Sequence, residues 1–130
     1  MPWVWLDERD ARTIHERLLA FHGGAEGVRD TGSLQSSLAR PEQRAAYGET
    51  PDVSDLAAAY TAGIVKNLPF VDGNKRTGFV LGILFLEMNG MRFTASEETA
   101  AQAVLDLAAG TMDMTGYAAF LRANMTHSKS

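Results

Sequence analysis

The sequence predicts an all-α fold, a compact single-domain helical bundle around a central apolar helix. Two observations lead to this fold class. Apolar residues recur at helical spacing in several segments that are bounded by capping residues, glycine or proline. In contrast, only the short run Met91-Arg92-Phe93 has the character of a β-strand. The 130 residues fit one domain that can bury a sizeable core, and they contain no repeat or low-complexity segment.

The first expected helix begins after Asp7, a favourable N-cap, and ends at Gly23-Gly24. Its apolar residues are Ile14, Leu18, Leu19 and Phe21. The glycine-rich residues 23–32 follow this helix, and we expect them to form an ordered loop or flap instead of a strand.

A short second helix is expected from Ser33 to Arg40. Serine is a good helix cap, and Pro41 disfavours helix in the residue before it. The polar residues 42–51 are expected to be a connection to the next helix.

The two longest helices are expected at residues 54–67 and 74–88. A proline two residues later ends the first, and Asn89-Gly90 closes the second. The second is apolar on every side in its middle, which predicts a helix at the centre of the fold. Gly78 and Gly82 lie four residues apart on one of its faces, where a neighbouring helix can approach closely.

Two further helices are expected at residues 96–109 and 115–124. Thr94 or Ser96 caps the first of them, and Gly110 ends it. The domain is then expected to comprise residues 1–125, followed by a flexible C-terminal tail at residues 126–130.

The composition limits the classes of function. The net charge of −4 argues against a protein whose whole surface binds nucleic acid, although a local basic site is compatible with it. The absence of cysteine excludes disulfides and thiolate zinc sites, and it fits a reducing cytoplasm. The three histidines lie far apart in the sequence, which argues against a histidine-rich metal site.

The expected localisation is cytoplasmic, with no membrane partner. The first ten residues lack the basic segment and apolar region of an export signal. The most apolar run, residues 79–86, is far shorter than the roughly 20 residues that cross a bilayer. We interpret it as part of a buried helix.

The most informative segment is residues 67–77, a polar turn that leads directly into the helix at residues 74–88. The start of a helix offers unpaired N–H groups and the positive end of the helix dipole, so it can bind an anion. Gly73 allows close approach of a ligand to the backbone, and Lys75 and Arg76 add two cations. Cations oppose the dipole at this end of a helix, and a bound polyphosphate would resolve that conflict.

Several residues of this loop have two interpretations. Asp72 is an ordinary N-cap or a carboxylate that holds Mg²⁺ against phosphates, and the two roles can coexist. Asn74 is a capping residue or a donor to phosphate. Lys75 and Arg76 are phosphate ligands or a solvated charge pair. Phe70 is expected in the core, where it supports the loop so that its neighbours face a cleft.

The loop resembles the signature of the Fic/Doc superfamily, and more closely that of its Doc (death-on-curing) branch. The family pattern His-Pro-Phe-x-Asp-Gly-Asn-Lys-Arg-Thr is matched at every specified position from Pro69 to Thr77. Residues 27–41 also resemble the family's Gly-Ile-Arg-Asp stretch and the short helix after it. The Fic branch has glycine and a second arginine where this chain has Lys75 and Phe79, which favours the Doc type.

This resemblance implies an enzyme that transfers a phosphate from ATP, with Mg²⁺, to a hydroxyl group of a target protein such as a translation elongation factor, and so arrests growth. A cognate antitoxin is expected to cover the active groove, and no direct nucleic-acid binding is expected. The implied site residues are the metal-binding Asp72, the phosphate-binding Gly73, Asn74, Lys75 and Arg76, the catalytic Asp72, Lys75 and Arg76, and the target-flap residues Arg29 and Asp30.

The chain departs from the family pattern at the catalytic histidine, whose position is occupied by Leu68. That histidine would take the proton from the attacking hydroxyl, and leucine has no lone pair to do so. A general base contributes about 10²- to 10⁴-fold in rate, so we expect binding to persist while turnover is largely lost. Asp72 is a partial substitute for the base. Leu68 marks a natural pseudoenzyme, an engineered inactive variant, or a mutation selected during expression.

Competing hypotheses of function follow. The leading hypothesis is a Doc-type kinase toxin weakened at Leu68, and Fic-type transfer of AMP is its chemical alternative. A second class is a pseudoenzyme that binds a nucleotide or an antitoxin segment without catalysis. The third is a helical structural protein in which the loop is only a capped turn. Nucleotide binding and transfer of label from ATP distinguish these hypotheses.

Overall fold

The computed structural model describes residues 2–47 and 50–128, and within them it confirms the all-α fold class. The described part of the chain forms six helices and one antiparallel sheet of two short strands. The helices are α1 (Glu8–His22), α2 (Thr31–Tyr47), α3 (Val53–Asn67), α4 (Asn74–Met88), α5 (Glu97–Ala109) and α6 (Met114–Ala123). The strands are β1 (Met91–Phe93) and β2 (Met125–His127). Among the described residues, no helix has the length and apolar character needed to cross a membrane.

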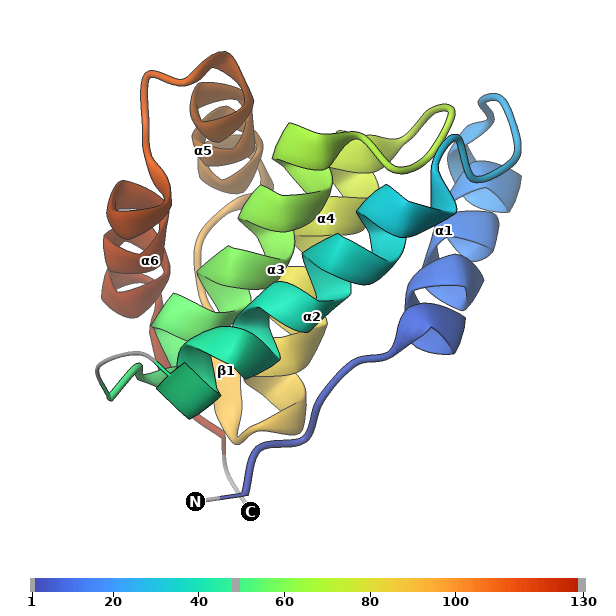
Figure 1. The fold of residues 1–130 in the computed structure, drawn as a ribbon. Helices are drawn as coiled ribbons and strands as arrows, with labels where there is room; N and C mark the ends of the chain where they lie inside the picture. The colour runs from blue at the N-terminus through green and yellow to red at the C-terminus, as the bar shows by residue number, and fades with distance from the viewer. Residues whose placement is uncertain (1, 48–49, 129–130) are drawn as a thin grey trace.

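The centre of the bundle is the pair α3 and α4. α3 packs against α4, α2 and α6, while α1 packs against α4. Figure 1 shows α2 in front of α3, with α1 on one side of the molecule and α5 and α6 on the other. Every residue from Leu56 to Val65 is buried, whereas Phe79, Val80 and Ile83 of α4 are only partly buried. The predicted central helix α4 therefore shares the centre with α3, which is the more enclosed of the two.

Two glycines allow α3 and α4 to pack closely, as the sequence predicted. A Cβ atom at Gly78 would lie 3.0 Å from Val65 Cγ2 and 3.1 Å from the carbonyl oxygen of Thr61. At Gly82 it would collide with Thr61 Oγ1. Because larger side chains at these positions would force the helices apart, this contact fixes the position of the N-terminus of α4 relative to α3.

The helix caps explain most of the boundaries. Asp7 forms a reciprocal capping box with Asp10 at the start of α1, and Ser96 caps α5, both at the predicted places. α4 also has the predicted limits. α3 begins one residue earlier than expected, because Asp52 caps it, again with a reciprocal capping box, and Ser54 lies within its first turn.

The second helix is longer than predicted, because α2 continues through Pro41 to residue 47. Proline has no N–H group to donate to the carbonyl group one turn earlier. For this reason the local sequence predicted that the helix ends at Arg40. However, Leu34, Leu38 and Pro41 recur at helical spacing and are all buried against the bundle. Their tertiary packing outweighs the local preference.

The C-terminal segment also differs from the prediction. Thr126 and His127, which were assigned to a flexible tail, lie in β2, where Thr126 pairs with Arg92 and His127 with Met91. The N–H group of Ser128 adds a hydrogen bond to the carbonyl oxygen of Gly90. The partner strand lies more than 30 residues away along the chain, so no local pattern reveals this pairing.

An ion pair at the start of α3 predicts a pH-dependent stability. Burial raises the pKa of the Asp52 carboxyl group, but hydrogen bonds from Arg122 and Ser54 outweigh burial and hold the pKa well below its usual value. Such a group stabilises the fold above its unfolded pKa, and this contribution is lost as the pH falls through the folded pKa. We expect the free energy of unfolding to decline below about pH 4, and Asp52→Asn to flatten that decline while keeping the cap.

Urea denaturation at several pH values above and below about pH 4 measures the free energy of unfolding of the native chain and of Asp52→Asn. Asp113, which caps α6, provides a control for replacing a capping aspartate as such. Parallel curves for the native chain and Asp52→Asn would contradict the prediction.

Candidate functional site

The connection between α3 and α4 is a closed polar loop. Leu68 ends α3 in the left-handed conformation, with φ of 51°, and Gly73 precedes α4 with φ of 78°. Between them, the Asn74 side chain reaches back to Phe70: Oδ1 accepts from the Phe70 N–H group at 2.9 Å, and Nδ2 donates to the Phe70 carbonyl oxygen at 2.9 Å. This double contact fixes the shape of the loop. Asn74 thus has a structural role in addition to any contact with a phosphate.

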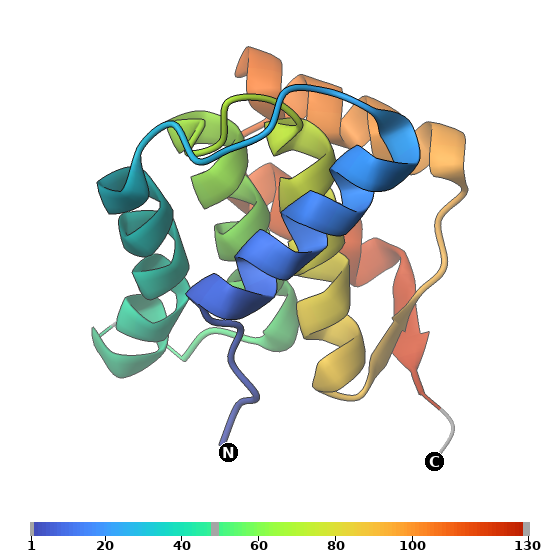
Figure 2. The same cartoon turned by 90° about the vertical axis from the view of Figure 1, so that its right-hand side faces the viewer.

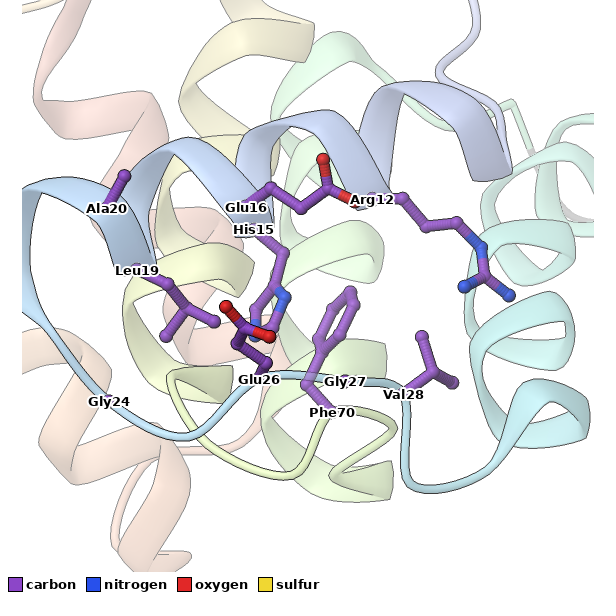
Figure 3. Close-up of a pocket in the computed structure, with 10 residues that line it drawn as sticks. All are labelled: Arg12, His15, Glu16, Leu19, Ala20, Gly24, Glu26, Gly27, Val28 and Phe70. Atoms are coloured by element: carbon purple, nitrogen blue, oxygen red, sulfur yellow. The ribbon is translucent and has the colours of Figure 1, made fainter.

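The loop is held against α1 by two buried aromatic rings. His15 and Phe70 are 3% and 1% exposed, and their rings stack with centroids 3.8 Å apart and 10° between the planes. His15 Nε2 lies 2.8 Å from the carbonyl oxygen of Asp72. Figure 3 shows His15 reaching from α1 to Phe70. The predicted support role of Phe70 agrees with this burial.

His15 is the site residue that sequence reasoning missed. It is separated from Asp72 by 57 residues, and the sequence offered only its place on the first expected helix. It does not replace the missing histidine at Leu68, because His15 lines a different pocket of about 510 Å³ between α1 and residues 24–28.

The flap was predicted at residues 23–32, but it ends at residue 30, because Thr31 and Gly32 begin α2. The flap is paired with the loop. Val28 and Phe70 form an antiparallel bridge, the Arg29 N–H group donates to the Pro69 carbonyl at 2.7 Å, and the Val71 N–H group donates to the Gly27 carbonyl at 3.0 Å. The two segments lie side by side at one end of the molecule in both views (Figures 1 and 2). The flap is thus an integral wall of the site.

The predicted flap residues Arg29 and Asp30 have partners within the chain. The Arg29 guanidinium donates to the carbonyl oxygens of Leu68 at 2.7 Å and Asn67 at 2.9 Å, so it satisfies the C-terminal end of α3. Asp30 Oδ1 accepts from the Ser33 N–H group at 3.0 Å, and this hydrogen bond lowers the pKa of Asp30. Asp30, and not Ser33, therefore caps α2.

The Asp72 carboxylate bridges the loop and the flap. Oδ1 accepts from the N–H group of Gly73 at 2.8 Å, and Oδ2 accepts from that of Ala25 at 3.2 Å. Gly24 has φ of 125°, which strains any other residue, and a Cβ atom there would lie 2.9 Å from Oδ2, so a larger residue would also displace the carboxylate. Asp72 is not the N-cap of α4, because that place belongs to Gly73 and no side chain caps this helix.

The first turn of α4 forms one wall of an open pocket of about 440 Å³. Lys75 and Arg76 are exposed and form no ion pair within the described residues. Their N–H groups and that of Asn74 likewise have no acceptor in the described part of the chain. These donors and charges can bind an anion. The pocket is lined by Arg29, Leu68, Phe70, Val71, Asp72, Gly73, Asn74, Lys75 and Arg76.

The residues of this pocket can hold a metal ion only together with a ligand that supplies further oxygen atoms to the ion. The described residues contain no group of three His, Asp or Glu side chains that could hold a metal. Each oxygen of Asp72 accepts one hydrogen bond and so keeps a lone pair. Since Mg²⁺ commonly uses one or two carboxylates together with phosphate oxygens, Asp72 fits a magnesium ion that arrives with a polyphosphate.

Leu68, at the position of the family histidine, supplies an apolar wall of the pocket. Its side chain lines the pocket and is 49% exposed. No histidine lines this pocket within the described residues. The site therefore has the features of a phosphate-binding pocket and lacks a side chain with an imidazole base.

Comparison with known proteins agrees with this geometry. A model of the Fic/DOC family matches residues 5–86, which include α1, the flap, the loop and most of α4. The chain is 31% identical over 109 residues to the protein kinase Doc of Escherichia phage P1, and the match covers 84% of this chain and 86% of that protein. It is 40% identical over 93 residues to the toxin Doc of Mycolicibacterium smegmatis, covering 70% and 68% respectively.

Proposed function

The chain belongs to the Fic/DOC family, and on that premise we propose that it is a Doc-type toxin whose loop binds ATP with Mg²⁺ for phosphate transfer to a hydroxyl group of a target protein. The observation that carries the proposal is the first turn of α4. There, free N–H groups, Lys75 and Arg76 converge on one open pocket beside the Asp72 carboxylate. One relative is named a protein kinase, which favours phosphate over AMP as the transferred group.

Six of the residues that line the pocket, Phe70 and Asp72 to Arg76, have a role in this reaction. The N–H groups after Gly73 hold phosphate oxygens, and Lys75 and Arg76 neutralise the charge that develops on the transferred group. Asp72 would hold the Mg²⁺, which would offset the negative charge of the phosphate groups. Asn74 and Phe70 keep the loop in the shape that presents these groups.

The proposed toxin is weakened at Leu68. The target hydroxyl must lose a proton as it attacks phosphorus, and no imidazole lines the pocket to accept it among the described residues. Catalysis of phosphoryl transfer rests mainly on positioning and charge stabilisation, so these parts of the site stay functional without the base. Binding of ATP is therefore expected to persist, and a pseudoenzyme that only binds is the second candidate function.

We further propose two protein partners. The target is a translation factor that offers a hydroxyl group, and the second partner is a cognate antitoxin. An apolar groove of about 660 Å³ between α1, α4 and α5 supports the latter, because Lys75 and Arg76 line both this groove and the loop pocket. A segment lying along the groove, against Phe79 and Ile83, would cover the pocket as well.

The experiment that tests this function is transfer of radioactive label into proteins of a bacterial extract, from ATP labelled at either the γ or the α phosphate. The native chain and its Leu68→His variant are compared. Label from γ-ATP, mainly with the variant, is the expected result. Label from α-ATP would instead indicate AMP transfer. ATP binding without label from either form would indicate the pseudoenzyme, and neither binding nor label would refute both candidates.

A further inference from the structure

We infer that His15 is a positioning residue, which sets the direction of the Asp72 carboxylate through a hydrogen bond to the Asp72 main chain. This inference rests on the proposed function for its consequence, because Asp72 is the proposed support of Mg²⁺. The inference is based on a contact between α1 and the loop. His15, which makes this contact, lies outside the family motif at residues 68–77. The Asp72 carbonyl oxygen can only accept, so the Nε2 atom of His15, 2.8 Å away, carries the hydrogen and donates it.

The geometry makes His15 a rigid support. Its side chain is 3% exposed, and its ring is stacked on that of Phe70, which is itself buried. Its helix, α1, is fixed at the N-terminus by the capping box of Asp7 and ends at the C-cap Gly23. The donor of the hydrogen bond therefore has little freedom to move.

The acceptor, in contrast, precedes a glycine, and the contacts of Asn74 with Phe70 do not include it. Gly73 follows Asp72 with φ of 78°, and a glycine peptide has few steric limits on rotation. Within the described residues, the hydrogen bonds that hold the Asp72 side chain come from the N–H groups of Gly73 and of Ala25, which lies in the glycine-rich flap. When the Asp72–Gly73 peptide rotates, the Gly73 N–H group leaves the carboxylate. The carboxylate then loses the direction in which it meets a metal-bound phosphate.

The same face of α1 also lies close to Gly73. A Cβ atom on Gly73 would lie 3.8 Å from His15 Nε2 and 3.7 Å from Leu19 Cδ2. α1 therefore lies beside both residues that precede the first turn of α4. Partners that orient a metal ligand affect metal affinity by about 10- to 100-fold, although they do not touch the metal.

Three substitutions separate the hydrogen bond from the packing. The amide nitrogen of His15→Gln is as many bonds from Cβ as Nε2, so it can restore the donor. That of His15→Asn corresponds to Nδ1 and falls short. These two variants lose the ring equally and form a matched pair. His15→Phe keeps the stacked ring and loses the donor, so it supplies the comparison if the asparagine variant does not fold.

The first measurement is the ATP affinity of each variant, by calorimetry, with and without Mg²⁺. Mg²⁺ is expected to raise the ATP affinity of the native chain by some factor. We expect this factor to be about 10- to 100-fold smaller in His15→Asn and His15→Phe, and nearly the native value in His15→Gln. Affinity without Mg²⁺ is expected to stay the same in all variants. Equal effects of glutamine and asparagine, or an unaltered Mg²⁺ gain in His15→Phe, would overturn the inference.

The second measurement needs no ligand. The Gly73 and Ala25 amide signals in NMR spectra report their hydrogen bonds to Asp72, and they are expected to shift upfield together in the asparagine and phenylalanine variants only. Unshifted signals in both would refute the positioning role. If the native chain binds no ATP at all, the proposed function fails, and these signals still decide whether His15 positions Asp72.

Discussion

Replacement of Leu68 by histidine is expected to raise the rate of phosphate transfer by about 10²- to 10⁴-fold, with little change in the affinity for ATP. The expectation follows from where Leu68 lies. Its side chain lines the pocket beside the first turn of α4 and is half exposed, so an imidazole ring at this position has access to a hydroxyl group that enters the pocket. The proposed phosphate-binding groups belong to other residues and are expected to stay in place.

The control for this prediction is Leu68→Asn. Position 68 has φ of 51°, a left-handed conformation that asparagine tolerates better than leucine does. Asparagine therefore relieves the same backbone strain and adds a polar side chain, but it cannot accept a proton at neutral pH. Single-turnover transfer from γ-labelled ATP, measured for both variants, isolates the base. Equal rates would show that backbone relief or polarity, and not the imidazole, produces the gain.

The parts of the fold that the sequence predicted well are those set by neighbouring residues. α4 has the predicted limits because its first turn follows Gly73 and Asn89-Gly90 closes it. Asp7 and Ser96 cap their helices as predicted, since a capping side chain bonds to a residue three positions away. The proposed phosphate-binding residues Gly73, Lys75 and Arg76 form one short segment, so the sequence already places them together, and all three line one pocket in the structure. Their role stays a prediction.

The parts that could not be predicted depend on contacts between distant segments. α2 continues through Pro41 because its buried face packs on α3, which no local rule for proline contains. β2 forms because β1 lies beside it.

The same limit applies to the site. Asp72 was interpreted as an N-cap or a metal ligand, but its carboxylate bonds to Ala25 in a segment 47 residues away. Arg29 was placed in a flap for a target, yet its guanidinium binds the carbonyl groups at the end of α3. His15 belongs to no motif in the sequence, and in the structure it lies against the loop. Local sequence identifies the chemical groups, and the bundle determines which of them support the others.

Substitution of Phe70 by alanine is expected to lower the free energy of unfolding by about 3–5 kcal/mol, a large part of the stability of a domain of this size. Phe70 is 1% exposed, and its ring is stacked on His15 between α1 and the loop. Removing the ring leaves a cavity between α1 and the loop, and the packed structure around such a cavity relaxes only in part. The loss also removes the support on which the imidazole of His15 lies.

Urea denaturation of Phe70→Ala measures this cost, and Phe21→Ala is the matched control, because Phe21 is 84% exposed and its removal is expected to change stability by less than about 0.5 kcal/mol. Amide hydrogen exchange locates the effect. Without urea, the N–H groups of Arg29 and Val71, which join the flap to the loop, are expected to exchange faster in Phe70→Ala than in the native chain. If Phe70→Ala costs no more than the control, or if exchange at these two amides is unchanged, the ring does not anchor the loop, and the loop keeps its shape through the Asn74 contacts and its hydrogen bonds to the flap.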